Sequence, residues 1–301
     1  MKTSLIIPSY NPALKLPQTL NSLVGQHELI DELIIVADQK NYSNEIKFML
    51  EQYSNKFNLK VVIQEISGRG RSRNKGAEVS NGDILIFLDD DMLAEKNLIE
   101  KHIQYHLKNP STIVSGNGYR NPENNATDDF GKFLINIEKG WKMQSPGAGE
   151  ITLQKFNFTA CNASLPKNIF NQLNGFDTCF SDGEDFDFAV RAINKGIRII
   201  YDKTILAWHN DWPGIGMYIK RQNEYTQAKI EILKIHPDYL VHFPSLMVSE
   251  GGKIKKIVSA IIRATIGRWV ISKNSMFEIL PLSIKFLFYR ITISSYSTIN
   301  I

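Results

Sequence analysis

Short apolar runs alternate with helix-like stretches along the first third of the chain. Continuous apolar runs rich in β-branched residues predict buried strands, and the stretches between them carry helical spacing. The expected strands are 4–8, 33–36, 59–63 and 84–88, and the expected helices are 16–24, 45–53 and 71–79. This alternation predicts an α/β fold in which a mostly parallel sheet has helices on both faces.

Polar residues follow three of these strands at their carboxyl ends. Open parallel sheets bind ligands at that edge. The residues concerned are Pro8 and Tyr10 after the first strand, Asp38 after the second, and Asp89 to Asp91 after the fourth. We therefore expect a nucleotide site there. The chain contains no GxGxxG or GxxxxGK[ST] loop, which disfavours ordinary dinucleotide and Walker-type sites.

The acidic triplet Asp89, Asp90 and Asp91 is the strongest chemical signal in the sequence. Three carboxylates this close repel one another, and burial makes each charge more costly. A divalent cation relieves that conflict, and carboxylate oxygens with one residue between them suit Mg²⁺ or Mn²⁺. Such an ion keeps open positions for substrate phosphates. The alternative is a solvated acidic cluster that opens a turn.

Composition and charge narrow the class of protein. The 301 residues are 43% hydrophobic and 22% charged, which is enough for a full core. Two cysteines, Cys161 and Cys179, do not form a disulfide framework, and this fits a reducing compartment. The net charge of +4 is uneven, because the tail from Gly251 to Ile301 carries eight basic residues and one acid. The tail is therefore +7 and the first 250 residues are −3.

The basic tail predicts an anionic partner. If 253–272 is one helix, four basic residues share one side: Lys253, Lys256, Arg263 and Arg268. The opposite side is apolar and includes Ile257, Ile261 and Trp269, which is the pattern of a helix that lies in a membrane surface. The stretch 276–293 is too interrupted by charge to span a bilayer. The alternative is an extension that packs on the preceding α/β domain. Nucleic acid is disfavoured, because no aromatic stacking pattern accompanies the charge.

Five short segments occur in a characteristic order. They are Pro8–Asn11, Glu32–Asp38, Gly68 with Ser72–Gly76, Gly82–Asp91, and Asn174–Asp177 followed by Gly183–Asp187 and Arg191. Together they resemble the family 2 glycosyltransferases, over about residues 1–230. The resemblance departs at Ala37-Asp38, where the family usually has two acids, and at Gln39-Lys40-Asn41, where it usually has Gly-Ser.

The resemblance implies a GT-A fold and assigns roles on the donor side. Pro8, Tyr10 and Asp38 would contact the nucleotide base, and Arg73 would lie near the nucleotide or the pyrophosphate. Asp89 would contact the ribose or a metal-bound water and Asp91 would hold the metal, with Asp90 as an extra ligand. From the residues alone, Asp38 could instead cap a helix. Arg73 could pair with a surface acid such as Asp83.

The resemblance also assigns the acceptor side. Asp185 would be the general base, in a single displacement that inverts the anomeric carbon, and Glu184 would bind an acceptor hydroxyl. His209, after the strand-like stretch 204–208, would be a third metal ligand, which favours Mn²⁺ somewhat. Asn162 and Trp208 are weaker candidates for substrate contacts. The alternatives are ordinary helix capping for the two acids and a structural role for the histidine.

These observations predict a metal-dependent, inverting glycosyltransferase. We expect it to move a sugar from a nucleotide sugar, UDP-linked, to a glycan or lipid-linked acceptor on the cytoplasmic face of the plasma membrane. The expected domains are a catalytic domain at 1–235, split near 120 into nucleotide and acceptor halves, and a basic helical extension at 236–301. Three alternatives stay open: a retaining GT-A enzyme, a sugar-nucleotide nucleotidyltransferase and a non-catalytic membrane scaffold. The second would need a Gly-rich phosphate loop, which Ser9-Tyr10-Asn11-Pro12 is not.

Overall fold

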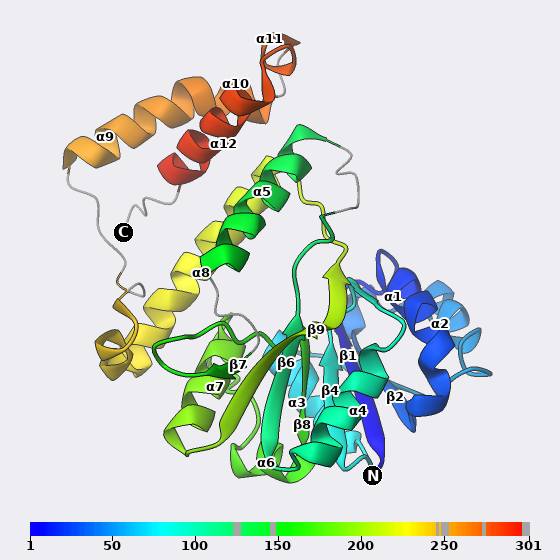
Figure 1. The fold of residues 1–301 in the computed structure, drawn as a ribbon. Helices are drawn as coiled ribbons and strands as arrows, with labels where there is room; N and C mark the ends of the chain where they lie inside the picture. The colour runs from blue at the N-terminus through cyan, green and yellow to red at the C-terminus, as the bar shows by residue number, and fades with distance from the viewer. Residues whose placement is uncertain (123–127, 145–148, 245–246, 248–252, 273–274, 297–301) are drawn as a thin grey trace. The chain divides into compact units, whose positions relative to one another are not determined.

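A mixed sheet organises the first two thirds of the chain (Figure 1). The computed structural model describes residues 1–122, 128–144, 149–244, 247, 253–272 and 275–296. Its strands lie in the order β3-β2-β1-β4-β8-β6-β9-β5, and β7 pairs with β9. Their bounds are β1 Thr3–Ser9, β2 Glu32–Asp38, β3 Leu59–Gln64, β4 Ile84–Leu88, β5 Met92–Ala94, β6 Thr112–Asn117, β7 Gly149–Ile151, β8 Asn162–Pro166 and β9 Arg198–His209.

The predicted parallel order is confirmed for the first four strands. β1 pairs in parallel with both β2 and β4, and β2 pairs in parallel with β3. β8 then runs antiparallel to β4 and to β6, so the sheet as a whole is mixed. Because β1, β2 and β4 point the same way, their carboxyl ends share one edge, which is where the sequence predicts a ligand site.

Helices cover both faces of this sheet, as the sequence predicts. On one face of the sheet, side chains of β1, β2 and β4 pack against α1, α2 and α4. On the other face, side chains of the same strands pack against α3, α6 and α7. The helices begin and end at α1 Leu16–Leu23, α2 Asn44–Glu51, α3 Arg69–Val79, α4 Leu98–Lys108, α6 Lys167–Gln172 and α7 Glu184–Asn194. Short 3₁₀ turns occupy η1 Val24–Leu29 and η2 Gln39–Asn41.

Gly76 brings α3 unusually close to the sheet. A Cβ atom at this position would lie 2.3 Å from a methyl group of Ile6 on β1. Only glycine allows this approach without a shift of helix or strand. The polar side chains of α3, including Arg73, are thereby held against the strands that form the site.

The chain divides into two compact units. The first holds residues 1–120 and 144–210, and the second holds 121–143 and 211–301. The second unit is helical and has its own core, which includes Phe130, Phe133, Ile215, Val270 and Tyr289. Its helices are α5 Asp129–Gln144, α8 Ile215–Ile235, α9 Lys253–Ile262, α10 Arg268–Ile271, α11 Ser275–Glu278 and α12 Leu282–Tyr296, with η3 at Pro237–Val241 and a π-helical turn η5 at Arg263–Gly267.

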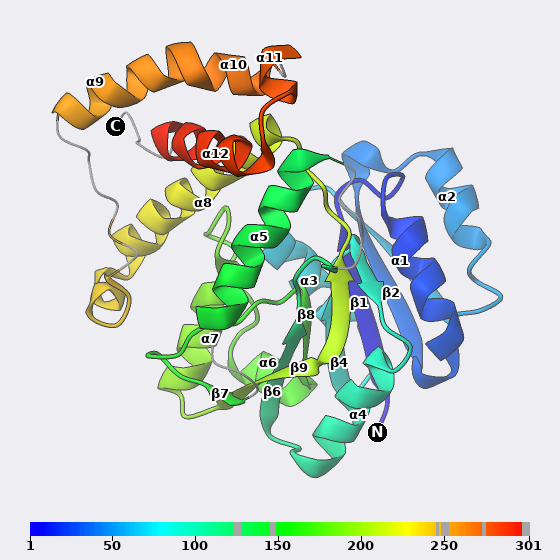
Figure 2. The same ribbon diagram turned by 45° about the horizontal axis from the view of Figure 1, so that its top comes forward.

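The helix expected over 253–272 forms as α9, η5 and α10 in succession (Figure 2). It packs along α12, and its inner side contributes Val270 to the core of the second unit. Among the described helices, none combines the length and the hydropathy that a bilayer crossing requires.

Candidate functional site

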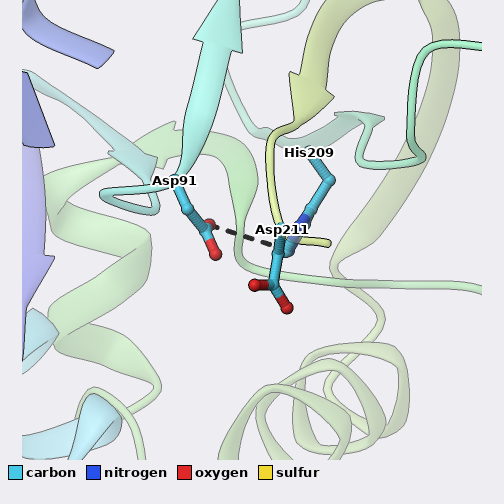
Figure 3. Close-up of side chains that lie close together, drawn as sticks. All are labelled: Asp91, His209 and Asp211. Atoms are coloured by element: carbon cyan, nitrogen blue, oxygen red, sulfur yellow. Dashed lines mark ion pairs between the residues drawn. The ribbon is translucent and has the colours of Figure 1, made fainter. Parts of the chain in front are cut away.

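Asp91, His209 and Asp211 bring metal-ligating side chains together at the ligand edge of the sheet (Figure 3). His209 Nε2 lies 3.7 Å from Asp91 Oδ1. Asp211 follows His209 by two residues, so the chain itself holds it beside the end of β9. Ligand atoms of the three residues lie within 4.8 Å of one another. The sequence predicts Asp91 and His209 as ligands but overlooks Asp211.

The spacing of these donors fits a divalent cation. Two ligands about 2.1 Å from one ion lie roughly 3 to 4.2 Å apart, and the Asp91–His209 distance falls in that range. Carboxylate oxygens with an imidazole nitrogen suit Mn²⁺ or a similar ion. The backbone holds both residues, because Asn210 N–H donates to Asp91 O at 2.7 Å and His209 N–H donates to Tyr119 O at 3.1 Å.

The other two acids of the triplet turn to different partners. The Ser9 hydroxyl donates to Asp90 Oδ2, and the Thr19 hydroxyl donates to the Asp90 carbonyl at 2.8 Å. Burial, reinforced by the charges of Asp91 and Asp89, raises the pKa of Asp90 to about 7. Asp89 Oδ1 pairs with Arg73 at 2.7 Å. Asp89 therefore faces a guanidinium rather than the group formed by Asp91 and His209.

Arg73 connects the acidic triplet to the start of α7. Its side chain is buried, and it pairs with Glu184 Oε1 at 2.6 Å as well as with Asp89. The surface pairing considered for Arg73 is thus not what the fold provides, because both partners lie inside the site. Glu184 is also buried, so the carboxylate expected to bind an acceptor hydroxyl already pairs with a guanidinium.

Asp185 is the more open carboxylate at the start of α7. Gly183, at the N-cap, takes a left-handed φ of 79°, which glycine accepts readily and which starts the helix at Glu184. Asp185 accepts hydrogen bonds from Phe186 N–H at 2.8 Å and from Ala160 N–H at 3.4 Å. Burial, followed by the charge of Glu184, raises the pKa of Asp185 to about 6. A carboxylate with that pKa can accept a proton near neutral pH.

The donor-base candidates lie at the ends of β1 and β2. Asp38 is buried, its Oδ1 accepts from Lys40 N–H at 3.0 Å, and its Oδ2 accepts from the Ser67 hydroxyl. It therefore caps η2, which is the alternative that the sequence leaves open. Pro8 is buried within β1, while Tyr10 is 65% exposed and accepts a hydrogen bond from Asn41 at its carbonyl.

Two weaker candidates have structural partners. Asn162 has no exposed surface, its amide donates to Asn117 O and Ile205 O, and its Oδ1 contacts His102 Nε2 at 2.9 Å. This places Asn162 in the interior, where a substrate cannot reach it. Trp208 is partly exposed on β9, and its Nε1–H donates to Glu95 at 2.7 Å.

Sequence reasoning also overlooks supporting polar residues at the same edge. Lys15 Nζ lies 3.6 Å from Asp91 Oδ2, and the hydroxyl of Ser9 binds Asp90. Arg69 pairs with Asp182 at 3.2 Å, next to the start of α7. The position of Arg69, one turn before Arg73 on α3, is the signal that could have pointed to it. Nothing in the local sequence marks Ser9 or Lys15.

The sequence matches the family described as Glycosyl transferase family 2 over residues 4–174, which is more than half of the chain. The chain therefore belongs to that family, and the resemblance seen in its motifs is confirmed. One similar relative is an uncharacterized glycosyltransferase, YfnE, of Bacillus subtilis (strain 168), 41% identical over 118 residues. That match covers 38% of this chain and 30% of the relative, so the chain spans under a third of the relative's length.

Solved structures support the fold assignment. S. aureus TarS 1-349 in complex with UDP has a TM-score of 0.59 and 18% identity, and the match covers 99% of this chain and 89% of that one. The mannosyltransferase PcManGT from Pyrobaculum calidifontis, in complex with GDP-Man and Mn²⁺, has a TM-score of 0.59 and 13% identity, with 98% and 85% covered. The expected GT-A-type architecture is thereby confirmed.

Proposed function

We propose that this chain is a metal-dependent, inverting glycosyltransferase. It transfers a sugar from a nucleotide-sugar donor, a UDP-sugar, to a hydroxyl group of a glycan or lipid-linked acceptor. The observation that carries the proposal is the link from Asp89 through Arg73 to Glu184. It joins the strand end that carries the candidate metal ligand Asp91 to the helix that carries Asp185, the candidate base. Membership of the family and the UDP complex of a protein with the same fold support a sugar-nucleotide donor.

The donor side of the proposal uses the ends of β1, β2 and β4. Tyr10 offers an exposed ring to the nucleotide base beside Pro8, with Asp38 as a further donor-side residue. Asp91, His209 and Asp211 would hold a divalent cation, with Asp89 and Asp90 beside them. Such an ion neutralises charge on the departing nucleoside diphosphate.

The acceptor side uses Asp185. Its carboxylate takes the proton from the acceptor hydroxyl while that oxygen forms a bond to the anomeric carbon. The bond from that carbon to the diphosphate breaks, and the nucleoside diphosphate leaves with the electron pair. One displacement of this kind inverts the anomeric configuration. Glu184 fixes the start of α7 by pairing with Arg73. Trp208, which precedes His209 in the chain, has a partly exposed ring that a substrate could contact.

The first experiment is a thermal-shift screen of UDP, GDP, CDP and ADP with and without Mn²⁺. A ligand that binds only the folded state raises the melting temperature by mass action. We expect UDP with Mn²⁺ to give the largest increase, and EDTA to remove it. A matching assay of UDP release from UDP-sugars, with the product anomer read by NMR, then tests transfer. A product that keeps the donor's configuration would favour the retaining alternative, and the absence of any nucleotide binding would favour the scaffold.

The pH dependence of turnover is a separate prediction. The working form of Asp185 is the ionised carboxylate, and burial with the charges of Glu184 and Asp182 raises its pKa to about 6, against the lowering effect of Arg73 and Arg69. Below that pKa the protonated base is inactive, so kcat/KM falls about tenfold per pH unit as the pH decreases. A profile measured from pH 5 to 8 tests this, and a rate independent of pH below 6 would contradict it.

We also propose that the second unit binds an anionic membrane surface. The outer side of α9 exposes Ile254, Ile257, Val258 and Ile261. On α12 the usual burial of apolar and exposure of polar residues is partly inverted. Lys285, Thr292 and Ser295 are buried, while Ile284 and Leu287 are exposed. Exposed apolar faces of this extent mark interaction surfaces, and the excess of basic residues in the tail suits anionic lipid.

The structure changes which tail residues this proposal uses. Arg263, one of the four residues on the predicted basic side, donates to Ser295 O at 2.6 Å, and Lys285 pairs with Asp129 at 2.6 Å, so both charges have partners within the second unit. Trp269 packs edge to face on Phe277 and so belongs to the core of the second unit. Exposed Ile257 and Ile261 remain for insertion, with Arg268 and Arg290 exposed on neighbouring helices.

Liposome co-sedimentation tests the membrane surface. Shortening the chain at 250 would remove Val270 and Tyr289 from the core of the second unit, so point substitutions are the better test. We expect Ile257→Ser with Ile261→Ser to reduce binding to vesicles containing phosphatidylglycerol at least tenfold, and salt to weaken binding of the native chain. Phe48→Ser, at a 67% exposed position on α2, is the matched control. Equal binding of both variants would contradict the proposal.

A further inference from the structure

Arg73 occupies a position that a simple nucleotide contact does not require. The residue is 2% exposed, and its two terminal nitrogens pair with different carboxylates. Nη2 pairs with Asp89 Oδ1 at 2.7 Å, and Nη1 pairs with Glu184 Oε1 at 2.6 Å. These two carboxylates come from the end of β4 and the start of α7, which are 95 residues apart in the chain.

The surroundings of Arg73 fix its side chain. Gly76 lets α3 approach β1, and the guanidinium lies 5.6 Å from the ring centre of Phe176. A charged group that is removed from water must be held by partners of opposite charge. Burial alone would lower the pKa of Arg73, but the charges of Asp89 and Glu184 raise it above its ordinary value. The fork of a guanidinium can bind two carboxylates at once, which a lysine ammonium does not reproduce.

We propose that Arg73 is a positioning residue that ties the donor-side Asp89 to the acceptor-side Glu184 and so fixes Asp185 at the start of α7. This inference rests on the proposed function of Asp185 as the base. Asp185 directly follows Glu184, so the ion pair that holds one residue also sets the backbone of the next. Arg73 then acts on the rate through Asp185 rather than through contact with the donor.

The charges around Asp185 give this idea a measurable sign. Glu184 and Asp182 raise the pKa of Asp185, and Arg73 and Arg69 lower it. Removing the positive charge of Arg73 should therefore shift the acid limb of the pH profile upward. Removing the negative charge of Glu184 should shift the same limb downward. A residue with only a structural role would move the limb in neither direction.

The experiment compares Arg73→Gln, Arg73→Lys and Glu184→Gln with the native chain. UDP release from a UDP-sugar is measured from pH 5 to 9, UDP affinity with Mn²⁺ by calorimetry, and folding by thermal melting. We expect kcat to fall 10- to 100-fold in all three variants while the Kd for UDP changes less than threefold. The acid limb should rise in Arg73→Gln, fall in Glu184→Gln and stay near its native position in Arg73→Lys, which keeps the charge. Arg71→Lys, at an exposed position on the same helix, is the matched control.

Several results would overturn the inference. A large increase in the Kd for UDP with normal kcat at saturating donor would make Arg73 a donor-binding residue, as the sequence predicts. Native kcat in Arg73→Lys would show that the fork is not needed. If Arg73→Gln fails to fold, Arg73→Lys and Glu184→Gln still decide the question, because each keeps one of the two charges. A native chain without any UDP release would overturn the proposed function and this inference with it, whereas active native enzyme with unaltered variants would overturn the inference alone.

Discussion

Asp185→Asn should reduce turnover by roughly 10²- to 10⁴-fold, the usual effect of losing a general base. The change keeps the shape of the side chain, and its Oδ1 can still accept the hydrogen bond from Phe186 N–H. What it removes is the group that accepts the proton of the acceptor hydroxyl. The remaining activity should lose the acid limb near pH 6, because the group responsible no longer titrates.

The Kd for UDP with Mn²⁺ should change little in this variant, since Asp185 lies on α7, whereas Asp91 follows β4, His209 ends β9 and Asp211 follows it. The matched control is Asp202→Asn, which changes a carboxylate on β9 whose described contacts are to Thr204. Near-native rates in Asp185→Asn would show that another group accepts the proton. A product that keeps the donor's anomeric configuration would contradict the single displacement.

The strands and helices of the first unit were predictable because their signals are local. The strand expected at 84–88 coincides with β4, and that expected at 59–63 lies within β3. A strand that is buried on both faces needs continuous apolar residues, so a short apolar run predicts its position. The antiparallel β8 is different, because its direction depends on a chain reversal more than seventy residues after β4.

The candidate site likewise contains residues that local sequence predicts and contacts that it does not. The position of Asp91 was predictable, because a strand end is recognised from the apolar run before it. The pairing of Arg73 with Glu184 joins residues 111 positions apart, and no short pattern in the sequence reports it. Asn162, a weaker candidate for a substrate contact, is buried, and its amide group binds His102 and two carbonyls, which no short pattern in the sequence reports.

The tail shows why helix patterns alone do not decide what a surface binds. The alternation of basic and apolar residues predicted a helix over 253–272, and it forms as α9, η5 and α10. The alternation did not reveal that α12 lies alongside or that Lys285 turns inward to Asp129. The sequence leaves two alternatives, packing and membrane contact. One side of this helix packs along α12, and we propose that the exposed opposite side contacts the membrane.

Asp91→Asn should abolish transfer and the Mn²⁺-dependent part of UDP binding while leaving the fold intact. The neutral amide loses the negative charge with which the Asp91 carboxylate attracts a divalent cation, although its size is unchanged. The backbone contact from Asn210 N–H to the carbonyl of residue 91 does not involve the side chain, so the loop should keep its position. The melting temperature without metal should therefore stay close to that of the native chain.

His209→Ala and Asp211→Asn should each weaken Mn²⁺-dependent UDP binding, which calorimetry measures. The matched control for Asp91 is Asp83→Asn, because Asp83 precedes β4 as Asp91 follows it and lies at the opposite edge of the sheet. Asp83 accepts a hydrogen bond from Lys2 N–H at an exposed position, so its loss should leave binding and turnover unchanged. Full activity of the native chain in EDTA, or native turnover in Asp91→Asn, would show that the reaction does not use a metal held at this group. Loss of binding in Asp91→Asn with unchanged binding in His209→Ala and Asp211→Asn would instead limit the metal contact to the strand end of β4.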